Sequence, residues 1–230
     1  MILSALVTYL AYEFNINFNV DLTLLSIAII FPLVFTIRGS FRRREKALEH
    51  LSEFRSTIKT VKYFLQSNND LSPEQQTEIR NILLEINLST LEHLSKNDYS
   101  MKSLDALVHK VYEFVSEQNE IIPRRLRDKV FRFMKDLHES IENLHAIHSH
   151  RTPISLKAYC KIFIYIFPVI YAPTIIYNIG LTGAEWISYL VVLLTEFILI
   201  SLYNIQNQLE YPFDNIGLDD IKLDTFRIER

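Results

Sequence analysis

Residues 22–37 read LTLLSIAIIFPLVFTI, an uncharged run that ends abruptly at Arg38. A membrane helix normally needs about 20 residues, slightly more than these 16. Local thinning of the bilayer can compensate for this difference in length. A cluster of cations follows directly, at Arg42, Arg43, Arg44 and Lys46. The stretch therefore predicts a transmembrane helix that continues into water.

Three further apolar segments complete the pattern, at residues 2–12, 162–180 and 186–205. The first is too short to cross a membrane alone, and we expect it to form a hairpin with residues 22–37. The prolines of residues 162–180 are compatible with a membrane helix, because neighbouring helices can satisfy the freed backbone groups. Trp186 begins the last segment, where its ring suits the membrane interface. The sequence therefore predicts four membrane passes, arranged as two hairpins.

The cations of the chain are distributed unevenly. All but three of its 24 Lys and Arg residues fall within residues 38–161, and neither hairpin turn contains one. Cytoplasmic loops of membrane proteins carry an excess of Lys and Arg, so this distribution predicts that residues 38–161 and both termini are cytoplasmic. The first apolar run has no cationic start and no small-residue cleavage site, so we expect no signal peptide. The single Cys160 excludes an internal disulfide.

The middle of the chain has the pattern of helices. Ser72, Pro73 and Glu74 predict a helix start, with a capping hydroxyl, a proline in the first turn and an acid at the positive end of the helix dipole. A further helix is expected from Arg124, because apolar residues recur at spacings of three and four; they are Leu126, Val130, Phe133, Leu137, Ile141 and Leu144. Such stripes need partners, which are either each other or the same helices of neighbouring subunits.

Residues 22–37 also carry a candidate pore lining. Ile27, Phe31 and Phe35 are spaced by four, so they lie nearly in line on one helical face. The line has two interpretations, since any membrane helix also needs side chains that face lipid or pack on a neighbour. If several copies surround an axis, the line becomes stacked apolar rings, and such a constriction can gate by losing its water.

Possible metal ligands occur in two places. The tail could hold a hard cation such as calcium with the carboxylates of Asp214, Asp219, Asp220 and Asp224, but its spacing does not match an EF-hand loop, and a solvated acidic turn is the simpler interpretation. His145, His148 and His150 lack a Cys or an acid at a spacing that completes a zinc site, so we expect exposed or proton-sensing histidines.

Several function classes find no support in the sequence. No nucleotide-binding loop, nucleophile motif or pair of carboxylates in an apolar setting occurs, so we expect no enzyme. Basic clusters at residues 42–46 and 124–129 could contact nucleic acid. Beside a membrane helix they serve topology or bind anionic lipid more simply, and we expect no nucleic-acid partner.

Two stretches resemble the bacterial bestrophin pattern. Residues 148–159, HSHRTPISLKAY, precede an apolar hairpin with a proline in its first arm, and residues 209–224, LEYPFDNIGLDDIKLD, follow that hairpin. The family pattern is an RTP-led helix, a hairpin, and a Glu-Asp-Pro-Phe-Gly tail that ends in Asn-Asp-Leu-Pro-Leu-Asp. The resemblance covers residues 145–224 and extends to residues 22–48, whereas the middle matches in helical character alone.

The resemblance implies a homopentameric ion channel with a central pore. Most members conduct anions, and at least some bacterial ones conduct monovalent cations. The residue types and spacing of Ile27, Phe31 and Phe35 are similar to those of the family's hydrophobic neck. The family's second, cytoplasmic constriction lies ahead of the RTP element, which points to Ile121 or Ile122.

Calcium control is not expected from the resemblance. Calcium-gated animal members use a Gln before Pro-Phe and a later acidic run, which Gln208 and Asp219 match here, while Ile216 occupies a ligand position. Asp214 replaces the usual Gly after Pro-Phe. The calcium candidates are therefore Gln208, Asp214 and Asp219, and no cofactor is expected.

We thus expect an all-α, four-pass, bestrophin-like pentameric channel in a cell inner membrane. Its regions are a first transmembrane hairpin (1–37), a cytoplasmic helical region (38–154), a second transmembrane hairpin (155–207) and a cytoplasmic acidic tail (208–230). Its expected partners are further copies of itself, membrane lipid and permeating small ions, chloride or other anions by the majority of the family. The alternatives are a monovalent cation channel of the same fold and a membrane-anchored scaffold or sensor without a pore.

Overall fold

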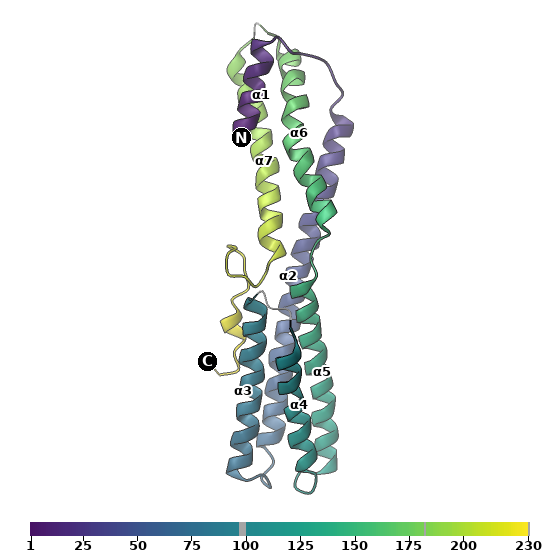
Figure 1. Ribbon diagram of the computed structural model, residues 1–230, viewed down its shortest axis with the longest axis vertical. Helices are drawn as coiled ribbons and strands as arrows, with labels where there is room; N and C mark the ends of the chain where they lie inside the picture. The colour runs from purple at the N-terminus through teal and green to yellow at the C-terminus, as the bar shows by residue number, and fades with distance from the viewer. Residues whose placement is uncertain (97–99, 182, 230) are drawn as a thin grey trace. The chain divides into compact units, whose positions relative to one another are not determined.

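The computed structural model describes residues 1–96, 100–181 and 183–229, and these residues are helical with connecting loops and no strand (Figure 1). The prediction of an all-α protein is confirmed. In chain order the helices are α1 (Ile2–Glu13), α2 (Thr23–Gln66), α3 (Pro73–Ser95), α4 (Lys102–Glu117), α5 (Arg124–Ser149), α6 (Ile154–Ile179), α7 (Glu185–Glu210) and the 3-10 helix η1 (Leu223–Phe226).

The chain forms two compact units. The first, here called the membrane unit, comprises residues 1–42 and 152–210; the second, the bundle unit, comprises residues 43–151 and 211–230. Among the described residues, three helical stretches are long and apolar enough to cross a membrane: α2, the run of residues 124–179 that contains α6, and α7. With 12 residues, α1 is about 18 Å long and shorter than the about 30 Å hydrocarbon core of a bilayer.

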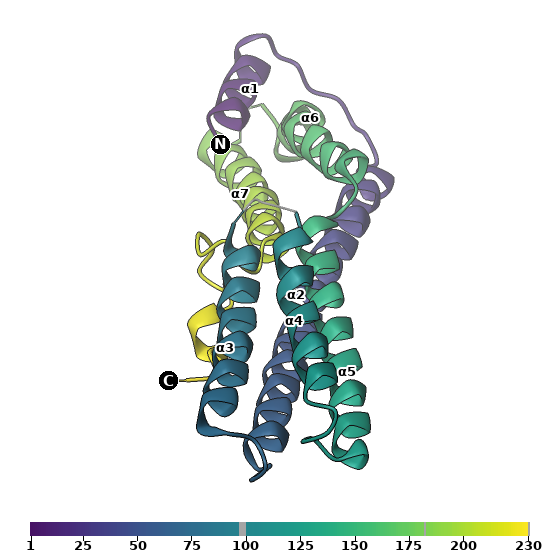
Figure 2. The same cartoon turned by 60° about the horizontal axis from the view of Figure 1, so that its bottom comes forward.

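Helix α1 packs against α6 and α7. Its buried face is small and partly polar, consisting of Ser4, Thr8 and Ala11. Small residues let helix backbones approach closely, which favours this partner choice. The Tyr12 hydroxyl donates to Ser188 Oγ on α7 at 2.8 Å. The predicted hairpin of residues 2–12 with 22–37 is therefore open, and the connection between α1 and α2 is extended (Figures 1 and 2).

The membrane unit has its own apolar core, to which α2, α6 and α7 contribute. The buried residues are Ile29, Leu33, Cys160, Ile164, Phe167 and Leu199. On α7, the Glu196 side chain is only 2% exposed and therefore faces protein. An acid at this depth is costly in lipid, which explains its inward direction.

The bundle unit contains the second half of α2, all of α3, α4 and α5, and the tail that includes η1 (Figure 2). The buried residues of α2 recur at alternating spacings of four and three, the seam of a coiled-coil-like packing; they are Ala47, Leu51, Phe54, Ile58, Val61 and Leu65. The predicted stripe of α5 enters the same core with Val130, Leu137, Ile141 and Leu144. The apolar stripes thus find their partners within one chain.

The predicted helix starts of this region are confirmed. Ser72 Oγ accepts a hydrogen bond from the Gln75 backbone N–H at 3.3 Å, and the Gln75 side chain accepts from the Ser72 N–H at 2.9 Å. This reciprocal capping satisfies two backbone N–H groups that otherwise lack a hydrogen-bond acceptor at a helix start. The last of these helices, α5, begins at Arg124, as expected from the periodicity.

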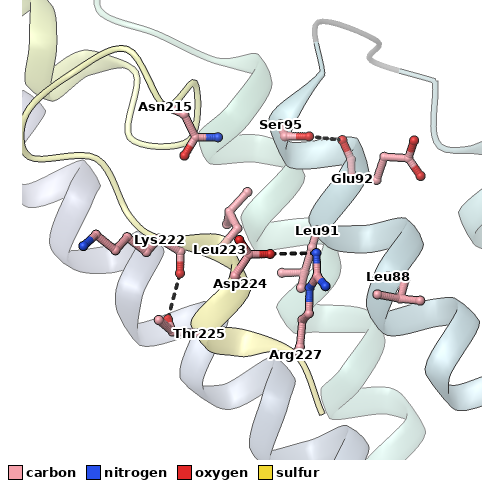
Figure 3. Close-up of a pocket in the computed structure, with 10 residues that line it drawn as sticks. All are labelled: Leu88, Leu91, Glu92, Ser95, Asn215, Lys222, Leu223, Asp224, Thr225 and Arg227. Atoms are coloured by element: carbon pink, nitrogen blue, oxygen red, sulfur yellow. Dashed lines mark hydrogen bonds and ion pairs between the residues drawn. The ribbon is translucent and has the colours of Figure 1, made fainter. Parts of the chain in front are cut away.

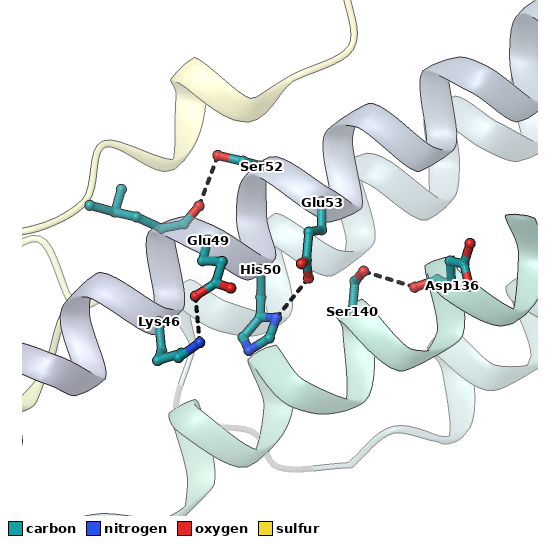
Figure 4. A network of polar contacts seen from close by, with 8 residues as sticks. Lys46, Glu49, His50, Ser52, Glu53, Asp136 and Ser140 are labelled. Atoms are coloured by element: carbon teal, nitrogen blue, oxygen red, sulfur yellow. Dashed lines mark hydrogen bonds and ion pairs between the residues drawn. The ribbon is translucent and has the colours of Figure 1, made fainter.

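The outer surface of the bundle carries local polar pairs. Figure 4 shows Lys46 with Glu49 and His50 with Glu53, at 2.6 and 2.9 Å on α2. On α5, the Ser140 hydroxyl donates to the Asp136 carbonyl at 2.8 Å. The Lys46–Glu49 pair lies on a solvated face, whereas Ser140 is only 3% exposed.

Candidate functional site

The three predicted neck residues lie on an exposed face of α2. Ile27, Phe31 and Phe35 are 46, 56 and 59% exposed, large fractions for apolar side chains in a folded chain. The Phe31 and Phe35 rings are neighbours, with centroids 6.0 Å apart. The chain's own core does not use this face, so it is available to line a pore, to contact lipid or to meet another copy.

The opposite face of α2 fixes this orientation. Ile29 and Leu33 are 2 and 1% exposed and pack with residues of α6 and α7. Because the side chains of an α-helix advance by about 100° per residue, burying these two residues turns Ile27, Phe31 and Phe35 away from the core.

Pro32 lies between the neck residues, and the fold compensates for it. A proline has no N–H, so the carbonyl four residues earlier, that of Ala28, loses its helical donor. The Tyr159 hydroxyl of α6 donates to the Ala28 carbonyl at 3.3 Å instead. An unpaired carbonyl is expensive inside a bilayer, and this bond lets α2 keep its proline without that cost.

A buried ionic group joins the ends of α6 and α7 that lie near each other in the membrane unit. Glu210 accepts from the Lys157 ammonium at 2.6 Å, from the Gln206 amide at 3.1 Å and from the Thr152 backbone N–H at 3.1 Å. Its side chain is 1% exposed. Sequence analysis missed this group, although Glu210 belongs to the quoted LEYPFD stretch. An acid immediately after a long apolar helix was the available signal.

The tail after α7 is fastened to the bundle by side chains of α2 and α3. Asn87, 1% exposed, donates to the Phe226 carbonyl at 3.2 Å and accepts from the Ile228 N–H at 3.0 Å. Hydrogen bonds from Lys62 and Arg80 hold Glu229 and lower the pKa of its carboxyl. These contacts join residues far apart in sequence, so sequence patterns did not reveal them.

The predicted calcium residues are divided between the two compact units. Gln208 lies on α7 in the membrane unit, whereas Asp214 and Asp219 lie in the bundle unit. The Asp219 backbone carbonyl accepts from Arg44 Nε at 2.7 Å. Burial, and then a hydrogen bond with Asp214, raise the pKa of the Asp220 carboxyl.

One other group of three metal-capable side chains occurs among the described residues. Ligand atoms of Asp105, His138 and Glu142 lie within 4.8 Å of one another, and all three residues are exposed. His138 and Glu142 are separated by one helical turn at 3.6 Å. Pairs with this spacing are common on helix surfaces.

A pocket of about 610 Å³ opens between α3 and the tail (Figure 3). Leu88 and Leu91 of α3 line one side, and Lys222, Asp224 and Arg227 of the tail line the other. Arg227 is paired with Asp224 at 2.7 Å, so these charges largely satisfy each other. Of the predicted site residues, Asp224, a possible cation ligand of the tail, lines this pocket.

The histidines before α6 gather with one from another helix. His93 Nε2 of α3 lies 3.0 Å from His145 Nδ1, and the His93 ring is 5.7 Å from that of His148. His148 is only 8% exposed, and burial lowers the pKa of its imidazole. The expectation of exposed histidines is therefore wrong for His148, because the helix phase that buries Leu144 also turns His148 inward.

The predicted cytoplasmic constriction falls in the turn between α4 and α5. Ile122 is completely buried in the core of its own chain, so its side chain is not available to line a pore. Ile121 is partly buried and packs against the same core. Only Ile121 remains a candidate for that constriction.

No protein-family model matches the chain, and no curated protein matches it in sequence. Solved structures do match. A bacterial bestrophin homologue from Klebsiella pneumoniae aligns with a TM-score of 0.80 at 15% identity, over 98% of this chain and 90% of that one. A point variant of the bacterial homologue from that organism aligns with a TM-score of 0.82 at 14% identity, over 98 and 92%. The chain therefore has the fold of the bacterial bestrophin homologues, as predicted from the RTP and Pro-Phe stretches.

Proposed function

We propose that this chain, whose fold is that of bacterial bestrophin homologues, is a subunit of an ion channel in a cell inner membrane. The observation that carries the proposal is the exposed apolar line of Ile27, Phe31 and Phe35 on a membrane-type helix of this fold. Several copies, five by resemblance, surround an axis and present this line to it. No enzymatic activity is part of the proposal.

The proposed neck works by the cost of desolvation. In a closed ring of subunits, each of the three positions becomes an apolar girdle, and water leaves a narrow apolar girdle readily. An ion that enters must give up hydration that isoleucine and phenylalanine side chains cannot replace. Conduction therefore requires the girdles to widen. The side chains of Ile27, Phe31 and Phe35 can move to allow this, because they are exposed and not part of the chain's core.

Chloride or another small anion is the permeating species that we propose, and a monovalent cation is the alternative. Further elements of the proposal are four membrane passes, with α1 entering the membrane beside α6 and α7, and cytoplasmic termini. Lipid contacts the remaining apolar surface. Calcium is not required for opening in this proposal, because Ile216 occupies a ligand position of the calcium-gated animal members.

The competing function is a membrane-anchored scaffold whose helices do not enclose a pore. Purified protein reconstituted in planar bilayers distinguishes the two, because a channel gives discrete unitary currents and a scaffold gives none. Native mass spectrometry in detergent supplies the second arm, with an expected mass of about five chains in a closed cyclic assembly. A monomer without current would contradict the proposal.

A further inference from the structure

The exposed line of α2 does not end with the apolar residues. Arg38 follows Phe35 by three positions and Arg42 follows it by seven. At about 100° per residue, both arginines fall within the sector of about 80° that Ile27, Phe31 and Phe35 cover. One side of α2 therefore carries three apolar residues and then two cations, and the exposed acid Glu45 follows in the same sector.

The two arginines are not used within the chain. Both are exposed, and in the described part of the protein neither has an ion pair or a side-chain hydrogen bond. Their neighbours Thr36 and Ser40 are 4 and 0% exposed and face the other way. By contrast, Arg44 donates to the Asp219 carbonyl at 2.7 Å. Arg38 and Arg42 thus differ from an arginine that fastens the fold.

A second exposed side of α2 is apolar over the same length. Ile30, Val34 and Phe41 are 47, 50 and 47% exposed, and at about 100° per residue they lie beside the first sector and not within it. This side suits lipid, because it remains apolar past the level of Arg38. The buried residues Ile29 and Leu33 lie opposite the arginines, so in a ring of copies whose cores face outward the side with the arginines faces the axis.

We propose that Arg38 and Arg42 form a basic collar at the cytoplasmic end of the neck and give the pore its preference for anions. This inference rests on the proposed channel function and names the class of ion that the channel carries. In a ring of subunits, each copy supplies two guanidinium groups to one short length of pore. Their summed potential raises the local concentration of anions and lowers that of cations. A guanidinium stays protonated at all physiological pH values, so the preference does not depend on pH.

The test is the chloride-to-sodium permeability ratio of reconstituted protein, measured from reversal potentials in a sodium chloride gradient. Three double variants are compared. Arg38→Lys with Arg42→Lys keeps the positive charges, Gln at both positions removes them, and Glu at both positions reverses them. We expect the ratio to be kept by Lys, to fall about tenfold or more in Gln, and to invert in Glu. The Gln effect should shrink in molar salt, where the screening length is about 3 Å.

The matched control changes two other exposed cations by the same amount. Lys102→Glu with Lys110→Glu on α4 reverses two charges outside the membrane unit, and it should leave the ratio within about twofold. A second approach uses protein that has already assembled, with Arg42→Cys modified by a cationic or an anionic thiol reagent. The cationic reagent should restore the chloride preference and the anionic one should reverse it, while Cys160 is buried.

The outcomes separate this inference from the channel function. Unitary currents with an unchanged ratio in the Gln variant overturn the collar and leave the channel standing. Absence of current from the unmodified protein overturns the channel function itself. If the arginines bind lipid headgroups instead, the ratio stays constant while assembly or activity of the Gln variant loses its dependence on anionic lipid, and this result also overturns the collar.

Discussion

The buried Glu210 gives a sharp test of how the membrane unit is held together. The change is Glu210→Gln, which keeps the size of the side chain and an oxygen that can accept from the Thr152 N–H. It removes the negative charge that Lys157 contacts at 2.6 Å. We predict a clear loss of thermal stability in the membrane unit.

The magnitude follows from burial. Removing one partner of a buried ion pair costs about 3–5 kcal/mol, because the other charge stays desolvated. The Lys157 side chain is 20% exposed against 1% for Glu210, so water still reaches the ammonium and we expect about 2–3 kcal/mol. For a chain of 230 residues, 1 kcal/mol corresponds to about 2–4 °C in Tm. The expected decrease is therefore about 4–12 °C.

The assay is thermal unfolding of the purified protein in detergent, with four variants compared. Lys157→Met removes the ammonium, and the double variant should lose less stability than the two single variants together. The control is Glu185→Gln at the start of α7, an exposed acid whose loss should cost less than about 0.5 kcal/mol. If Glu210→Gln behaves like this control, or if the two single effects simply add, Glu210 does not pair with Lys157 as described.

Three further predictions concern topology, calcium and pH. A cysteine at Asn17 should react with an impermeant reagent applied outside intact cells and one at Asn81 should not; labelling of Asn81 would reverse the topology. Conductance should change little between chelator and micromolar calcium, and steep activation lost in Asp219→Ala would show that the tail binds calcium. Burial lowers the pKa of His148 below its ordinary value of 6.5, so the unfolded chain takes up this proton first. The neutral His148 therefore contributes fully to the stability of the fold above about pH 6.5. This contribution is lost as the pH falls through the pKa of His148 in the folded protein. His148→Asn should remove this part of the pH dependence of Tm, and an unchanged profile would contradict it.

Local patterns predicted the features that depend on local chemistry. Ser72 caps α3 through a bond to Gln75, and such a capping box is readable from four consecutive residues. The register of Ile27, Phe31 and Phe35 follows from the helical period, and the structure places all three on one exposed face. These features need no knowledge of distant parts of the chain.

Features that depend on distant partners were missed or predicted incorrectly. The family resemblance pointed to Ile121 or Ile122 as a pore constriction, but the completely buried side chain of Ile122, in the turn after α4, belongs to the core. The sequence order of α1 and α2 suggested a hairpin, whereas the small face of α1 packs on α6 and α7. Asn87 reaches Phe226 over 139 positions, a distance at which no periodicity carries information.

The neck is the central claim, and one measurement addresses it directly. Unitary currents are recorded from purified protein and from a variant with Ile27, Phe31 and Phe35 all replaced by Ala. Truncating a packed Phe costs about 3–5 kcal/mol, whereas side chains 46 to 59% exposed should cost far less, so the variant should assemble normally. Its girdles are wider and wetter, and we expect a higher open probability than in the unmodified channel. Poor assembly with unchanged gating would show that these three residues pack the protein and that the pore lies elsewhere.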